Sequence, residues 1–138
     1  MALAALWTFR CYGALGANDG FRSECEAQSK RVQRKFRNRL TALAELEFSE
    51  WVKQGTLAKE LKRECAGLTE IRFEADNVQQ RPLGYRVGPD EFIFLFWAHE
   101  KGDKWVPKNA CKKARDRQRA VNTVGKEVRT HALWFALE

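Results

Sequence analysis

The segment Phe92–Ala98 constrains the fold more than any other part of the chain, because it holds seven consecutive apolar or aromatic residues. A membrane span needs about 18 such residues, so this run is too short to be one. It also does not alternate with polar residues, which is typical of a strand covered on both faces. We therefore predict a buried central strand here.

Two segments before this run alternate between apolar and polar residues, as strands with one buried face do. They cover residues 70–75 and 83–87, and the turn-forming sequences Asp76-Asn77 and Gly88-Pro89-Asp90 follow them. The pattern predicts an antiparallel meander of three strands, the last of which is central. Residues 7–12 alternate in the same way and predict an N-terminal strand.

Helical spacing dominates between these strands. Ser23 with Glu26 three residues later resembles a capping box, and it predicts a helix over residues 23–45. A shorter helix is expected over residues 56–65, ended by Gly67.

The end of the chain follows the meander. Residues 99–104 are expected to form a basic loop, and Pro107 suits the first turn of a C-terminal helix that reaches about Val121. Residues 122–138 fit a helix, a strand or a partner-bound segment equally well. The predicted fold class is thus α+β, with a small, mostly antiparallel sheet in one domain over residues 1–138.

Charge and cysteine content narrow the function classes. Lys and Arg outnumber Asp and Glu by 25 to 18, which favours polyanionic partners such as nucleic acid, or an acidic protein. The cysteines show neither CxxC pairs nor His at zinc-ligand spacing, so we expect reduced thiols, no metal site and no disulfide framework. They are Cys11, Cys25, Cys65 and Cys111. A cytoplasmic protein without a membrane segment follows from this interpretation.

Four segments together resemble the RelE/HigB toxin superfamily, particularly its phage-derived HigB-like branch. They are Gly67–Phe73, the pair Gln80-Arg81, the Phe92–Ala98 strand, and the basic stretch through Lys101 and Lys104 to Pro107. Members of the branch typically show a GLxELRF strand, an arginine that opens the next strand, and a basic segment before the last helix. The likeness spans about Ala5 to Val121.

The resemblance implies a toxin of a type II toxin–antitoxin pair, a ribosome-dependent mRNA endoribonuclease that inhibits translation. No Gly-rich phosphate loop, HExxH motif or pair of catalytic carboxylates stands out, so we expect a mechanism without metal or cofactor. The expected partners are mRNA, the ribosome and a cognate helix-turn-helix antitoxin. The toxin would contact operator DNA only through this antitoxin. The order of elements expected from the residues also resembles this superfamily: an N-terminal strand, two helices, the meander and a C-terminal helix.

Such cleavage needs the ribose 2′-hydroxyl aligned with the adjacent phosphate, and cations to neutralise the charge that develops. By the resemblance, the strand arginines and loop lysines supply that charge, while His99 is the candidate for proton transfer. Relatives usually carry an aromatic or small residue near His99. The five candidate catalytic residues are Arg72, Arg81, His99, Lys101 and Lys104.

A structural role is an alternative for each candidate. Arg72 and Arg81 could form exposed cross-strand ion pairs with Glu70 or Glu74, and the lysines could be ordinary solvated loop residues. His99 could serve packing alone.

Further cations predict contact with RNA. Six of the ten residues from Lys30 to Arg39 are basic and none is acidic, whereas a merely solvated helix face normally mixes charges. Trp105 could stack on a base or anchor the core. The residues assigned to RNA binding are Lys30, Arg31, Arg34, Lys35, Arg37, Arg39, Arg86, Trp105, Lys108 and Lys112.

Two other functions remain open. One is a non-catalytic RNA- or protein-binding member of the same fold, which the lack of an obvious general base favours. The other is a phage-derived structural or assembly adaptor.

Overall fold

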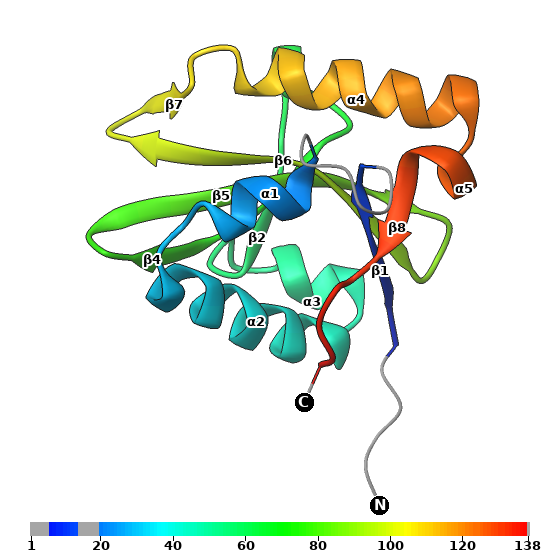
Figure 1. The fold of residues 1–138 in the computed structure, drawn as a ribbon. Helices are drawn as coiled ribbons and strands as arrows, with labels where there is room; N and C mark the ends of the chain where they lie inside the picture. The colour runs from blue at the N-terminus through cyan, green and yellow to red at the C-terminus, as the bar shows by residue number, and fades with distance from the viewer. Residues whose placement is uncertain (1–5, 14–19, 138) are drawn as a thin grey trace, which may run out of the picture.

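A computed structural model describes residues 6–13 and 20–137. Within these residues the chain forms a mixed α+β fold, with an eight-stranded, mostly antiparallel sheet in the order β2-β3-β5-β6-β1-β8, to which β4 and β7 are joined through β5 and β6 (Figure 1). The strands are β1 (Thr8–Tyr12), β2 (Ala58–Glu60), β3 (Thr69–Ile71), β4 (Phe73–Ala75), β5 (Val78–Val87), β6 (Glu91–Lys101), β7 (Lys104–Val106) and β8 (Thr130–Ala132).

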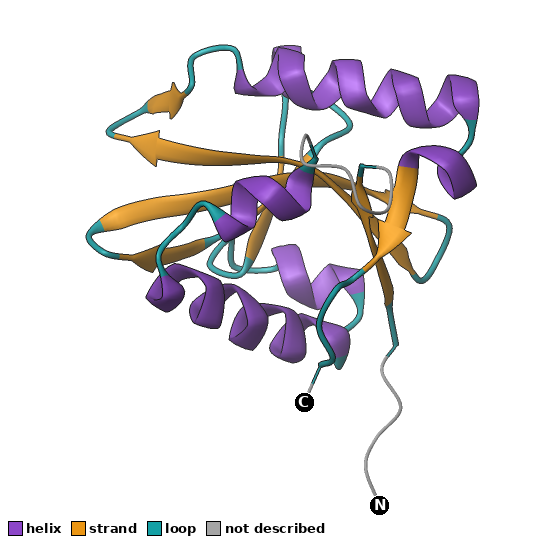
Figure 2. Ribbon diagram, in the orientation of Figure 1, coloured by secondary structure: helices purple, strands orange, loops and turns teal. Residues whose placement is uncertain are grey.

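Helices cover both faces of this sheet. Helix α4 lies over one face, and α1, α2 and α3 lie over the other (Figure 2). The helical elements are α1 (Phe21–Glu26), α2 (Lys30–Ala44), α3 (Phe48–Val52), the 3₁₀ turn η1 (Arg63–Cys65), α4 (Ala110–Val124) and α5 (Lys126–Arg129).

The predicted meander is confirmed, and β6 is its central member. Strand β6 pairs antiparallel with β5 on one side and parallel with β1 on the other. Asp76 and Asn77 both have positive φ, 57° and 62°, as the tight hairpin turn between β4 and β5 requires. The predicted N-terminal strand is also confirmed, as β1.

The unbroken apolar run of β6 serves two separate cores. A β-bulge opposite Leu83 and Gly84 shifts the register, so that two consecutive residues of β6 face the same way. The side chains packed with α1, α2 and α3 are Phe92, Phe94 and Trp97. Those packed with α4 are Ile93, Leu95, Phe96 and Ala98. Burial on both faces therefore explains why this strand has no polar positions.

The long helix predicted over residues 23–45 is wrong in its start and its continuity. Ser29, not Ser23, is the N-cap of α2, and its hydroxyl accepts a hydrogen bond from the Val32 amide at 3.1 Å. Ser23 lies inside α1 and donates instead to the Gly20 carbonyl at 2.9 Å. The extended backbone of Ser29 separates the two helices.

The helix predicted over residues 56–65 is also wrong, because this segment holds the edge strand β2 and the turn η1. Leu57 and Leu61 have helical spacing, yet Leu57 packs on the core beside α1–α3 and Leu61 on the core beside α4. They therefore contact opposite faces of the sheet. The helix that follows α2 is α3, which lies upstream of the predicted segment.

The basic loop predicted over residues 99–104 is a β-hairpin between β6 and β7. Pro107 precedes α4 rather than lying in its first turn, since Asn109 is the N-cap. The tail forms α5 and β8, and β8 pairs antiparallel with β1 at the sheet edge. Leu133, Trp134, Phe135 and Leu137 then pack against the core beside α1–α3.

A disulfide joins Cys65 of η1 to Cys111 in the first turn of α4, with the Cα atoms 5.3 Å apart. The prediction of four reduced thiols is therefore wrong for this pair, which is 46 residues apart in sequence and carries no spacing signal. Cys11 and Cys25 are free and buried. Burial raises the pKa of Cys25 to about 12 and that of Cys11 well above its usual value, so both are unreactive thiols.

Candidate functional site

The sheet divides the predicted catalytic residues into two groups. Residues directly opposite in paired strands share a face, and neighbours along one strand alternate. His99 is opposite the exposed Val106, and Lys101 is opposite Lys104, so these side chains share the face that α1 and α2 cover. Arg81 is opposite Ala98, which packs with α4, so Arg81 lies on the other face.

Arg81 is buried in an ionic cluster. Its side chain is 3% exposed, and its Nε lies 2.9 Å from Oε2 of Glu70, although the N–H does not point at that oxygen. Its Nη2 lies 3.3 Å from Glu100 Oε1, and its Nη1 donates to the Gln80 carbonyl at 2.9 Å. The cross-strand pair with Glu70 considered from the sequence is present, but it is buried rather than exposed.

Burial controls the titration of the Glu70–Arg81 pair. Desolvation raises the pKa of Glu70, and the nearby Arg81 guanidinium only partly opposes that effect. Desolvation likewise lowers the pKa of Arg81. The cluster therefore joins β3, β5 and β6 and presents little free positive charge.

Arg72 belongs to the same region. Its Nη1 donates a hydrogen bond of 2.7 Å to the carbonyl of Gly55, in the segment between α3 and β2. Its charge also lowers the pKa of Glu70. Arg72 is partly buried and anchors this segment to the sheet.

His99 has a defined hydrogen-bond partner on the helical side. Gln28, just beyond the end of α1, donates its amide Nε2 to the Glu24 carbonyl at 3.1 Å, which turns its Oε1 toward His99 Nε2, also at 3.1 Å. Because Oε1 only accepts, this chain of bonds assigns the proton to Nε2 and leaves Nδ1 of the neutral ring unprotonated. Burial lowers the pKa of His99, which favours that neutral ring.

His99 lines a hollow of about 510 Å³ between the α1–α2 junction and the β6–β7 hairpin. Val32 and Val106 give it apolar walls, while Gln28, Asp76 and Lys101 give it polar ones. We call it the His99 hollow. Lys104 lies opposite Lys101 at the exposed hairpin tip, so a base and two cations gather at one end of the sheet.

The basic helix α2 is mostly exposed. Lys30, Arg31 and Arg34 form no ion pair within the described part of the chain. Lys35 and Arg37 are held locally, by the Glu74 carbonyl at 3.0 Å and the Phe135 ring at 4.7 Å. Arg39 is half-buried, and desolvation lowers its pKa.

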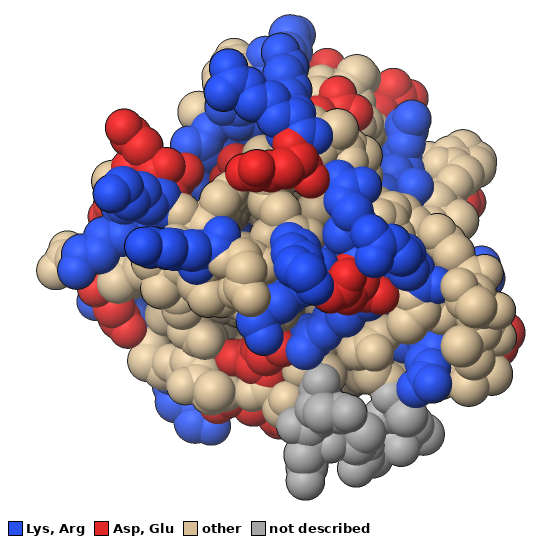
Figure 3. All heavy atoms as spheres, turned by 90° about the horizontal axis from the view of Figure 1, so that it is seen from above, with Lys and Arg blue, Asp and Glu red and all other residues tan. Residues whose placement is uncertain are grey.

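The remaining residues predicted to contact RNA differ in whether other side chains already hold them. Arg86 stacks on Phe48 at 4.5 Å, and Trp105 is half-buried against the core beside α4. Lys108 is exposed, whereas Lys112 pairs with Asp116 at 2.9 Å. Viewed from the side of α4, Lys and Arg side chains spread across the surface with a few acidic groups between them (Figure 3).

Sequence reasoning missed the residues that organise the site. Gln28 determines the tautomer of His99, and no local motif marks it. Glu24 accepts a hydrogen bond from the Trp97 amide at 3.0 Å and pairs with Arg117 at 2.7 Å, where β6 extends beyond its partner β1. Among the residues that organise the site, the sequence indicated only Glu70, because it lies two positions before Arg72 in the segment Gly67–Phe73.

Comparisons with protein-family models, with curated proteins and with solved structures found no match to this chain. Within residues 6–13 and 20–137, no group of three His, Cys, Asp or Glu side chains could hold a metal ion. Nor does the described part contain a helix with the length and apolar character that crossing a membrane requires.

Proposed function

We propose that this chain is a ribosome-dependent mRNA endoribonuclease, the toxin of a type II toxin–antitoxin pair. The observation that carries the proposal is the His99 hollow, where a neutral imidazole with an unprotonated Nδ1 lies beside Lys101. A base and a cation in one cleft are the groups that cleavage of RNA through its own 2′-hydroxyl requires.

In this proposal His99 Nδ1 takes the proton of the ribose 2′-hydroxyl, and the 2′-oxygen attacks the adjacent phosphorus. The bond from phosphorus to the 5′-oxygen breaks, and water protonates that leaving oxygen. The products are a 2′,3′-cyclic phosphate and a 5′-hydroxyl end. Lys101 and Lys104 neutralise the charge on the phosphoryl oxygens, and no metal or redox partner is consumed.

Arg72 and Arg81 have a positioning role in this mechanism. Arg81 is tied to two carboxylates and could contact a phosphate only by leaving them. By holding Glu100 beside Glu70, it sets the base of the β6–β7 hairpin that carries both lysines. The exposed cations of α2 supply binding to ribosomal RNA phosphates, and such binding weakens with salt.

The proposed partners follow from the function. The toxin acts in the cytoplasm on translating ribosomes, and a helix-turn-helix antitoxin holds it inactive and carries it to operator DNA. A neighbouring reading frame for a small helix-turn-helix protein would support this assignment.

Controlled expression in bacteria, followed by mapping of mRNA ends, tests the proposal. The parent chain should arrest growth and create new 5′-hydroxyl ends within translated messages. His99→Ala should abolish both effects, whereas His131→Ala, which removes the other histidine, should keep them. Normal growth and unchanged transcripts in the presence of folded parent protein would reject the enzymatic function.

A second candidate function is a non-catalytic RNA-binding module of the same fold. The burial and neutralisation of Arg81 favour it, because they remove a cation that the family pattern assigns to the phosphate. This candidate predicts ribosome co-sedimentation without any new mRNA ends.

A further inference from the structure

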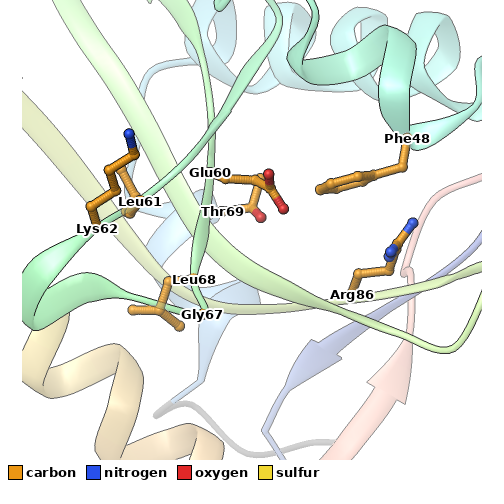
Figure 4. A pocket seen from close by; sticks show the side chains of 8 residues that line it. All are labelled: Phe48, Glu60, Leu61, Lys62, Gly67, Leu68, Thr69 and Arg86. Carbon is orange, nitrogen blue, oxygen red and sulfur yellow. The ribbon is translucent and has the colours of Figure 1, made fainter.

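A second hollow lies at the opposite end of the sheet, near the edge strand β2. It has a volume of about 410 Å³ and is bounded by β2, β3, β5 and the first residue of α3. Glu60, Phe48 and Arg86 reach toward one another across it, and Thr69 lies beside Glu60 (Figure 4). None of the roles proposed for the His99 hollow involves this site.

Arg86 is oriented in this hollow but not neutralised. Its guanidinium lies 4.5 Å from the centroid of the Phe48 ring. The Phe48 ring is itself held by Trp7 and Trp51, at 6.2 and 5.5 Å between centroids. Arg86 forms no hydrogen bond or ion pair with any described residue, so its N–H donors are free for a ligand while the stacking limits its motion.

Two acceptors lie on the same side of the sheet. Glu60 and Thr69 are directly opposite each other in β2 and β3, so their side chains share a face. Thr69 is only 4% exposed, yet its hydroxyl forms no hydrogen bond within the described part of the chain. Glu60 likewise has no ion pair with Arg86 or with any other described cation. The hollow thus presents a donor group and an acceptor group that do not satisfy each other.

We propose that this hollow binds a guanine base. Guanine carries two acceptors, O6 and N7, which suit a bidentate bond from Arg86. On the adjacent edge it carries the donors N1–H and N2–H₂, which suit the carboxylate of Glu60, and the Thr69 hydroxyl can accept from N2. A volume of about 410 Å³ is also within the range of small-molecule sites.

The same groups disfavour adenine. Adenine places its N6 amino group beside N7, so it would turn a donor toward the donors of Arg86. Its N1 is an acceptor and would face the carboxylate of Glu60. Adenine should therefore bind more weakly than guanine, because it would turn its donor toward Arg86 and its acceptor toward Glu60.

Calorimetric titration with GMP and AMP tests the proposal without any need for cleavage activity. GMP should bind at least tenfold more tightly than AMP. Arg86→Ala should weaken GMP binding at least tenfold, and Glu60→Gln should lower the ratio of GMP to AMP affinity while keeping the part that Arg86 provides. Arg129→Ala removes an exposed cation of α5, which has no assigned binding role, and should leave GMP binding unchanged. Thermal melting of each variant confirms that it is folded.

Short single-stranded RNAs that differ in one central base distinguish the two sources of guanine. A pentanucleotide with a central guanine among uridines that outcompetes GMP would identify a base within RNA, whereas GMP binding alone would identify a free nucleotide. Equal affinity for GMP and AMP, or unchanged GMP binding by Arg86→Ala, would overturn the site. A guanine-selective protein that leaves mRNA intact would refute only the toxin function.

Discussion

At the β6–β7 end of the sheet, a cationic side chain is buried and paired on one face, whereas another is exposed on the other face. On the face beside α4, Arg81 is 3% exposed between Glu70 and Glu100, and the Cys65–Cys111 disulfide ties η1 to α4. On the other face, Lys101 stays exposed beside the neutral His99. The difference comes from strand parity, since a shift of one residue along a strand moves a side chain to the other face. A cation that the sequence assigns to a binding or catalytic role is therefore available for it only where its face of the sheet is open.

Removing Arg81 should have the largest effect on stability. Arg81→Ala would leave Glu70 buried without its partner, and breaking a buried pair in this way costs about 3 to 5 kcal/mol. Urea unfolding measures the loss. Lys104→Ala, at the exposed hairpin tip, should change stability by less than about 0.5 kcal/mol. Equal stability of Arg81→Ala and the parent would show that Arg81 does not hold the strands together and is free to contact RNA.

Opening the disulfide should have the next largest effect. A crosslink between residues 46 apart restricts the unfolded chain, and its loss should cost about 2 to 4 kcal/mol. The Cys65→Ser/Cys111→Ser variant and the chemically reduced parent should unfold at the same lower urea concentration. The NMR signals of His99 should stay unchanged in the variant, since its partner Gln28 lies on the other face. A shift of those signals would show that the two faces are coupled.

The hairpin lysines should affect the rate of cleavage but not stability. If Lys101 and Lys104 stabilise charge that appears only in the transition state, each change to Ala should slow single-turnover cleavage on programmed ribosomes by about 10- to 100-fold. Ribosome binding should stay within about twofold, because the α2 cations remain. Full activity in both variants would exclude the hairpin tip from the proposed active site.

The smallest effect should be a pH dependence that His99 adds to stability. Burial lowers the pKa of His99 in the folded chain, so the unfolded chain takes up a proton first as the pH falls below about 6.5. Stability should therefore decline from that pH downward, until the folded ring also becomes protonated. His99→Gln should remove this decline, as unfolding at pH 7 and pH 5.5 can show. An identical decline in the variant would assign the pH dependence to other groups.

Local patterns in the sequence were sufficient to determine the framework of the sheet. Seven apolar residues in a row cannot be satisfied at a surface, so Phe92–Ala98 had to be covered on both sides, as it is. Alternation determined β1 and the apolar face of β5 formed by Leu83, Tyr85 and Val87, although residues 80–85 of β5 are buried on both faces. Asp76-Asn77 determined the tight turn before β5, because these residue types tolerate positive φ.

Contacts between distant segments decided the rest. Leu57 and Leu61 had helical spacing, but pairing with β3 drew their segment into the sheet. Cys65 found Cys111 only because η1 packs against α4, and Gln28 reached His99 only because α1 ends above β6. The sequence determined which residues prefer strand or turn, since those preferences act over a few neighbours. Register, bulge and packing decided which face each side chain occupies, and hence that Arg81 is buried in an ion cluster while His99 borders an open hollow.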